Sequence, residues 1–229
     1  MRRACISLLL MVSVACGGYG GSTPTTPTPP TPTPPTPAPN RAPTVSATAS
    51  PAFGIHGLTT FTITATGSDP DSDALTYSWS VGDGSSSTSA SFTRVFTQGG
   101  SFTPTVTVDD GRGGTASAST AAITVGSMTG SWRGTSGPSA LGTYSFTLSQ
   151  ENTGRITGTY FDSVFGAGQL DAASTTNRID AQGAIEMRVK QGPFSDWTFR
   201  GQMDQTGRRI TGGIFGSGFN GQPFTIEKS

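Results

Sequence analysis

The residues with the most chemical potential are aspartates that gather in a few short turns. Asp69, Asp71 and Asp73 lie in the stretch SDPDSD, Asp83 lies in GDG, and Asp110 ends the stretch VDD. A catalytic pair needs two carboxylates in contrasting environments, whereas the neighbouring proline and serine favour an open polar turn. Calcium takes several oxygen ligands from a loop, and turns use a carboxylate to accept backbone N–H groups. Calcium binding and turn capping are therefore the interpretations to compare.

Other reactive side chains are few and scattered. His56 is the single histidine, in the stretch FGIHG, and nothing around it resembles a nucleophile elbow. The glutamates are Glu151, Glu186 and Glu227, at positions typical of turns and exposed strand faces. Glycine-rich stretches alternate with strand residues instead of opening a helix, which argues against a phosphate-binding loop. We therefore predict that this protein is not an enzyme.

The elements that position these residues are predicted to be β-strands. Charged residues make up 12% of the 229 residues, while 32 glycines and 16 prolines supply turns. Apolar and polar residues alternate in residues 60–65 and 75–81, the period of a strand with one buried face. Tyr77 and Trp79 share the apolar face, which predicts core packing for both. Residues 42–125 as a whole predict about six or seven short strands at the spacing of a β-sandwich.

An aromatic pair followed by a Gly-Asp-Gly turn is the most specific motif of this segment. Its residues are Tyr77, Trp79, Gly82, Asp83 and Gly84. They resemble the hallmark run Tyr-x-Trp-x-Phe-Gly-Asp-Gly of the PKD (polycystic-kidney-disease) repeat. The later part of the match consists of Phe96, Gly100, Phe102, Val106 and Val108. The resemblance implies an immunoglobulin-like β-sandwich, a module that commonly binds proteins or carbohydrates in extracellular bacterial proteins.

The same resemblance gives the calcium interpretation a ligand set. Some PKD-like domains bind calcium with an asparagine before the first strand, the Asp-x-Asp turn and the aspartate after the last core strand. The matching positions here are Asn40, Asp69, Asp71 and Asp110, so calcium is the cofactor that the resemblance implies. The interpretation that the residues themselves favour is that these aspartates cap turns, as we expect for Asp83.

Proline marks a special position in the strand SFTPTVTV. Pro104 lies in its middle and has no N–H to donate to a neighbouring strand. We therefore expect this position at a sheet edge or a β-bulge.

Residues 127–229 contain two stretches of similar sequence. The stretches at 146–161 and 199–215 share a strand, a polar turn with Thr-Gly and then Arg-Ile-Thr-Gly, and each predicts a β-hairpin. Together with their neighbours they predict about eight consecutive strands that close into an up-and-down barrel. The stretch GSW at 130–132, with ITGTY after it, loosely resembles the avidin and lipocalin superfamily. An eight-stranded barrel holds one small ligand or is filled by its own side chains. The phenylalanines available for filling are Phe146, Phe161, Phe165, Phe194, Phe199, Phe215, Phe219 and Phe224.

The N-terminus is predicted to be a targeting segment. Arg2 and Arg3 precede the apolar run ACISLLLMVSVA, which is shorter than the roughly 20 residues of a transmembrane helix. Residues 1–15 are therefore expected to be a signal peptide. The stretch SVAC followed by two glycines resembles a bacterial lipobox with Cys16 as the lipidated residue; cleavage that leaves a free secreted protein is the alternative. Residues 16–41, rich in proline and threonine, are expected to form an extended stalk.

Composition also limits the partners. Removal of the two N-terminal arginines leaves 12 basic against 14 acidic residues, without the basic stripe of a nucleic-acid binder. We expect a lipid-anchored protein of the outer membrane or cell surface. Its sandwich (42–126) and barrel (127–229) would serve binding or adhesion to an extracellular protein or polysaccharide. The alternatives are a carrier of a small apolar ligand and the substrate-attachment subunit of a secreted hydrolase.

Overall fold

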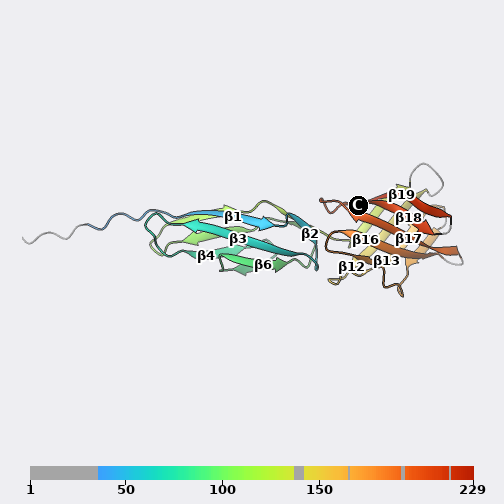
Figure 1. Cartoon of the computed structure of the whole chain (residues 1–229), viewed down its shortest axis with the longest axis horizontal. Helices are drawn as coiled ribbons and strands as arrows, with labels where there is room; N and C mark the ends of the chain where they lie inside the picture. Colours follow the sequence, from blue (N-terminus) through green and yellow to red (C-terminus); the bar gives the residue numbers. More distant parts are fainter. Residues whose placement is uncertain (1–35, 137–141, 165, 192–193, 217) are drawn as a thin grey trace, which may run out of the picture. The chain divides into compact units, whose positions relative to one another are not determined.

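The computed structural model describes residues 36–136, 142–164, 166–191, 194–216 and 218–229. The expected signal peptide, Cys16 and the stalk as far as residue 35 lie outside these residues. All regular secondary structure in the described part is β-strand (Figure 1), which confirms the all-β prediction. No helix in that part is long and apolar enough to cross a membrane.

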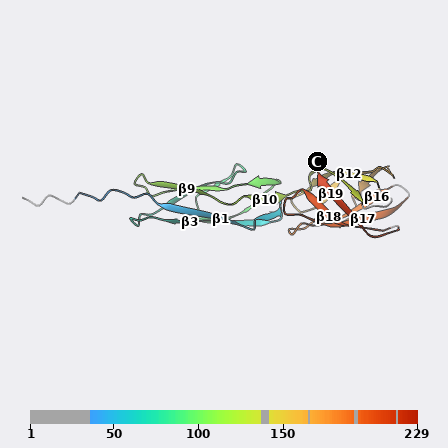
Figure 2. The same ribbon diagram turned by 90° about the horizontal axis from the view of Figure 1, so that it is seen from above.

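The N-terminal strands form a sandwich around one apolar core (Figures 1 and 2). One sheet has the order β1 (Thr44–Ser50), β3 (Thr60–Ser68), β6 (Ser91–Val95). The other has the order β5 (Ser86–Ser87), β4 (Thr76–Ser80), β8 (Thr105–Asp109), β9 (Thr115–Ser119). A third, smaller sheet has the order β2 (Phe53–Ile55), β10 (Ile123–Gly126), β7 (Gly100–Phe102). The alternation in the sequence places Phe61, Trp79 and Val106 in the core, where each is at most 2% exposed.

Pro104 interrupts the strand in which the sequence placed it. The chain leaves β7 at Phe102 and enters β8 at Thr105, and the two strands belong to different sheets. Pro104 is buried between them, and its carbonyl accepts the Thr120 N–H at 2.9 Å. The expected edge or bulge is therefore a switch between sheets, made where the ring leaves no N–H for a ladder bond.

The C-terminal strands form a closed barrel. Its strands are β11 (Gly130–Ser136), β12 (Thr143–Gln150), β13 (Ile156–Asp162), β14 (Gly166–Leu170), β16 (Ala184–Gln191), β17 (Phe194–Met203), β18 (Arg209–Gly216) and β19 (Phe219–Lys228). Each pairs with the next along the chain, and the pairing of β11 with β19 closes the ring. The short β15 (Arg178–Ile179) adds to β16 beside β14. The predicted eight-stranded up-and-down barrel is confirmed, including both hairpins.

Aromatic side chains pack against one another inside this barrel. The Phe199 ring, 0% exposed, lies 5.4 Å from Phe146, 5.3 Å from Phe224 and 5.8 Å from Tyr144 between ring centroids. Trp132 is equally buried, and its indole N–H donates to the Met128 carbonyl at 2.8 Å. These contacts bring large aromatic side chains together in the described interior.

Two of the phenylalanines expected to fill the barrel lie on its outside instead. Phe161 is 51% exposed, because its neighbours Tyr160 and Asp162 point inward and strand alternation turns Phe161 out. Phe215 is half-buried beneath the guanidinium of Arg200, which lies 5.5 Å from the ring centroid. Phe165 and the Phe194 side chain lie outside the described residues.

Candidate functional site

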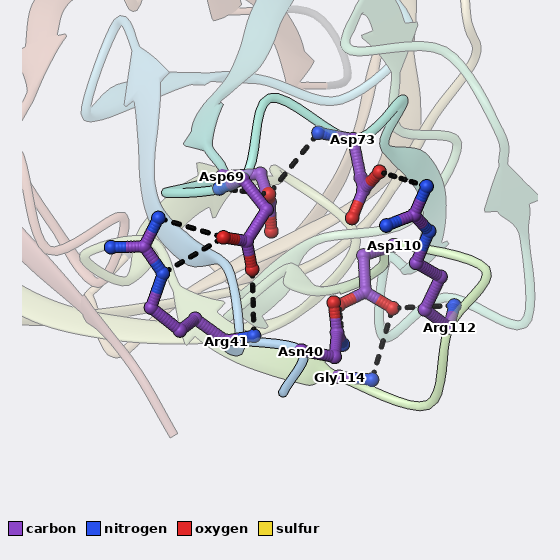
Figure 3. A network of polar contacts seen from close by, with 8 residues as sticks. Asn40, Arg41, Asp69, Asp73, Asp110, Arg112 and Gly114 are labelled. Atoms are coloured by element: carbon purple, nitrogen blue, oxygen red, sulfur yellow. Dashed lines mark hydrogen bonds and ion pairs between the residues drawn. The ribbon is translucent and has the colours of Figure 1, made fainter. Parts of the chain in front are cut away.

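Two regions hold the candidate residues, and the first is the corner where the sandwich aspartates meet (Figure 3). Asp69 caps the turn between β3 and β4, since its Oδ1 accepts the N–H groups of Asp71 at 2.8 Å and Asp73 at 3.1 Å. Positive φ at Ser72, 64°, closes this turn. The expectation that these aspartates serve turns agrees with the contacts of Asp69.

Asp110 caps the turn between β8 and β9 in the same way. Its Oδ1 accepts the N–H groups of Arg112 at 2.7 Å and Gly114 at 2.9 Å. Its Oδ2 accepts Nδ2 of Asn40 at 2.8 Å, and this bond from Asn40 is the main reason that the pKa of Asp110 is lowered. Asp110 is only 5% exposed, so both oxygens are committed to neighbours inside the protein.

Two arginines form ion pairs with the remaining carboxylates of this corner. Arg41 donates from Nε and from Nη2 to one Asp71 oxygen at 2.8 and 2.7 Å, and its backbone N–H donates to the other at 2.8 Å. The side-chain bond from Arg41 lowers the pKa of Asp71. Arg112 lies 3.2 Å from Asp73. Asp71 and Asp73 thus each have a cationic partner through one oxygen.

The arrangement fits a calcium ion in part. Asp69, Asp71 and Asp73 each offer an oxygen within 4.8 Å of the others, and carboxylate oxygens are the ligands calcium prefers. Oδ2 of Asp69 and Oδ2 of Asp73 are buried and accept no hydrogen bond from the described residues. Asn40 and Asp110, the other two expected ligands, bond to each other. An ion here would be held chiefly by the three turn aspartates, and would have to displace Arg41 from Asp71.

The PKD motif residues serve packing and turn geometry. Trp79 is 2% exposed and its indole N–H donates to the Ser89 carbonyl at 3.0 Å. Gly82 and Gly84 have φ of 91° and 85°, which favour glycine. Burial alone would raise the pKa of Asp83, but hydrogen bonds from Ser85 and Arg94 outweigh it and lower that pKa. Tyr77 packs against the same core.

His56 is buried in the loop after β2. Its backbone N–H donates to the Gly126 carbonyl at 3.0 Å, and neither ring nitrogen has a partner among the described residues. Burial lowers the pKa of His56, which favours the neutral ring.

The second region is a hollow of about 430 Å³ on the outer face of β12, β13 and β14. We call this hollow the β12–β14 groove. The outward side chains that line it are Ser145, Thr147, Thr159, Phe161, Ala167 and Gln169. Sequence reasoning missed it, because the phenylalanines were counted as interior residues without regard to strand phase. The signal was available in GTYFD, where Phe161 stands between two inward positions.

Comparison with known proteins identifies a family for the sandwich. Residues 40–125 match the family model described as the PKD domain. No match was found among curated protein sequences. A carbohydrate-binding module from the β-sandwich superfamily has 16% identity, with a TM-score of 0.37 over 83% of this chain and 93% of that chain. A quinonprotein alcohol dehydrogenase-like protein from Bacteroides thetaiotaomicron has 13% identity, with a TM-score of 0.25 over 68% and 44% of the two chains. Residues 40–125 are thus a PKD domain, which the closed eight-stranded barrel follows in the chain.

Proposed function

We propose that this protein is an exported, non-catalytic protein that binds an extracellular protein or polysaccharide through its outer surface. The observation that carries the proposal is that each aspartate of the corner is used within the protein: Asp69 and Asp110 cap turns, and Asp71 and Asp73 form ion pairs with arginine. The PKD domain is itself a non-catalytic module. The apolar side chains of both cores are buried, so a partner meets mainly polar strand faces and turns.

Export and anchoring are part of the same proposal and rest on the N-terminal sequence. The basic residues, the short apolar run and SVAC followed by two glycines support a signal peptide and acylation of Cys16. The proline- and threonine-rich residues that follow support an extended spacer between the lipid and the folded strands. An anchored binding protein gains from such a spacer, because it extends the reach of its domains.

Among the two alternatives, the small-ligand carrier has the weaker support. Tyr144, Phe146, Phe199 and Phe224 occupy the described interior with rings 5.3–5.8 Å apart. A substrate-attachment subunit of a secreted hydrolase would use the same outer surface as the proposed binding protein. It differs only in needing a catalytic partner.

The test is retention of bacterial cells that express the full chain on surfaces coated with fibronectin, collagen, xylan or mixed-linkage β-glucan. We expect at least one coating to retain these cells above cells with an empty vector. Incorporation of labelled palmitate, lost in Cys16→Ser, is expected for the anchor. Equal retention of both cell types on every coating would contradict the binding role, and hydrolysis of a coating by the purified chain would contradict the non-catalytic one.

A further inference from the structure

The β12–β14 groove is built as two rows of side chains across three strands. Pairing aligns Ser145, Phe161 and Ala167 in one row. The second row aligns Thr147, Thr159 and Gln169. Directly opposed residues on neighbouring strands have Cβ atoms about 4.5–5.5 Å apart, so large neighbours would cover the Phe161 ring. Serine and alanine are too short to do so. The ring therefore stays 51% exposed in the first row, beside a second row that is entirely polar.

The polar groups of the groove have no partners within the described protein. The side chains of Ser145, Thr147, Thr159 and Gln169 make no hydrogen bond to any described residue. Outward hydroxyls of the sandwich behave differently. There the cross-strand pairs Thr64–Ser91, Thr105–Ser119 and Thr107–Ser117 bond to each other, each at 2.9 Å. The groove thus presents hydroxyl and amide groups that a ligand can use without breaking an internal bond.

The outward side chains of the groove also carry no charge. Four other hollows of the described surface each include arginine or lysine, and two of them add a carboxylate. Charges begin one strand away on either side, with Arg133 opposite Ser145 and Lys190 opposite Gln169. Lys190 is already paired with Asp171 at 3.2 Å. A charged ligand would therefore find its partners at the rim and not on the floor of the groove.

From these observations we propose that the β12–β14 groove binds a neutral polysaccharide, with Phe161 as the stacking platform. This inference rests on the proposed binding function and names its site and ligand class. A sugar ring has an apolar face that can lie on an aromatic ring and a rim of hydroxyls that exchange hydrogen bonds with threonine and glutamine. The hollow of about 430 Å³ is within the range of about 300–1,000 Å³ seen for small-ligand sites. Its open form suits a stretch of a longer chain.

Affinity electrophoresis tests this proposal with the full chain carrying Cys16→Ser, which removes the proposed acylation point. Gels contain mixed-linkage β-glucan, xylan, galactomannan or pullulan as neutral polymers, and alginate as an anionic one. We expect at least one neutral polymer to retard the protein. Phe161→Ala should weaken retention at least about tenfold, equivalent to about 1.4 kcal/mol. Phe161→Tyr should keep most of it, and Gln169→Ala should weaken it to a smaller extent.

Phe215→Ala is the matched control, because Phe215 also lies on the outside of the barrel but under Arg200. It should leave retention unchanged. Equal loss in both phenylalanine variants, no loss in Phe161→Ala, retardation by alginate alone or retardation by no polymer would each overturn the proposal. In those cases, cell retention on a protein coating would leave the proposed binding function standing. If the cells were not retained on a protein coating either, the result would contradict both the groove proposal and the proposed binding function.

Discussion

The aspartate corner of the sandwich and the β12–β14 groove of the barrel differ in what their side chains are doing. The corner holds the most reactive groups of the molecule, yet Asp71, Asp110 and their neighbours are bonded to residues of the same chain. The outward side chains of the groove offer only phenyl, hydroxyl, methyl and amide groups, and the polar ones have no partner among the described residues. A clustering of reactive residues therefore indicated a structural role here, and the binding surface that we propose consists of unreactive residues left free.

The largest expected effect compares two phenylalanines on opposite faces of the barrel wall. Phe199→Ala removes a fully buried ring that packs against four other aromatic rings and should cost about 3–5 kcal/mol of unfolding free energy. Phe161→Ala removes a half-exposed ring and should change it by less than about 0.5 kcal/mol. Denaturant unfolding of both variants measures the difference. A similar loss in both would mean that Phe161 serves packing, against its proposed role in the groove.

The next effect compares a carboxylate that accepts hydrogen bonds within the protein with a hydroxyl that forms none with a described residue. Asp110→Ala leaves Asn40 and the N–H groups of Arg112 and Gly114 without their acceptor. We expect the Tm to fall by about 4–8 °C, the change that 1 kcal/mol produces in a domain of 60–100 residues. Thr159→Val should move it by no more than about 1 °C, because that hydroxyl forms no hydrogen bond with the part of the chain that the structure describes. Thermal unfolding followed by circular dichroism tests both. An unchanged Tm in Asp110→Ala would show that the cap does not stabilise the fold.

A smaller effect is expected from pH, which should change the stability of the fold but not ligand binding in the groove. Burial lowers the pKa of His56, so the unfolded chain takes up this proton first below about pH 6.5, and stability declines. Asp71, Asp83 and Asp110 have lowered pKa values, so the stability that they supply is present above about pH 4 and is lost below it. The outward groove residues do not titrate. We expect the Tm to decline from pH 7 to 4 while polysaccharide retention stays constant.

His56→Gln is the control for the upper part of this profile and should flatten the decline between pH 7 and 5. Retention that follows the Tm would contradict the separation of the two regions. It would indicate that ligand binding depends on titratable groups outside the groove.

The smallest expected effect concerns calcium. Arg41 and Arg112 already neutralise Asp71 and Asp73, so 1 mM calcium should raise the Tm of the unaltered chain by less than about 1 °C, as weak binding requires. The double variant Arg41→Ala, Arg112→Ala frees these carboxylates and should respond more strongly. Differential scanning calorimetry with and without chelator tests both. A shift of several degrees in the unaltered chain would instead support the calcium site that the PKD resemblance implies.

Several features of this molecule could be predicted because they depend on neighbours close in sequence. Strand alternation placed Trp79 in the core, and the two Thr-Gly turns indicated the barrel hairpins, since both follow from local backbone geometry. Pro104 was predicted to disturb a ladder, but a missing N–H does not say whether the chain bulges or changes sheet. Phe161 was assigned to the interior because composition alone does not give the phase of a strand.

The sequence by itself determined the all-β architecture, the PKD domain and the turn role of Asp83, because each requires only a few adjacent residues. The tertiary structure decided which of those groups remain available. Arg41 reaches Asp71 across 30 positions of the chain, and the groove needs Thr147, Thr159 and Gln169 from three strands in one register. Partnership depends on such distant neighbours, so only the folded chain shows that each corner aspartate has a partner and that the groove hydroxyls have none among the described residues.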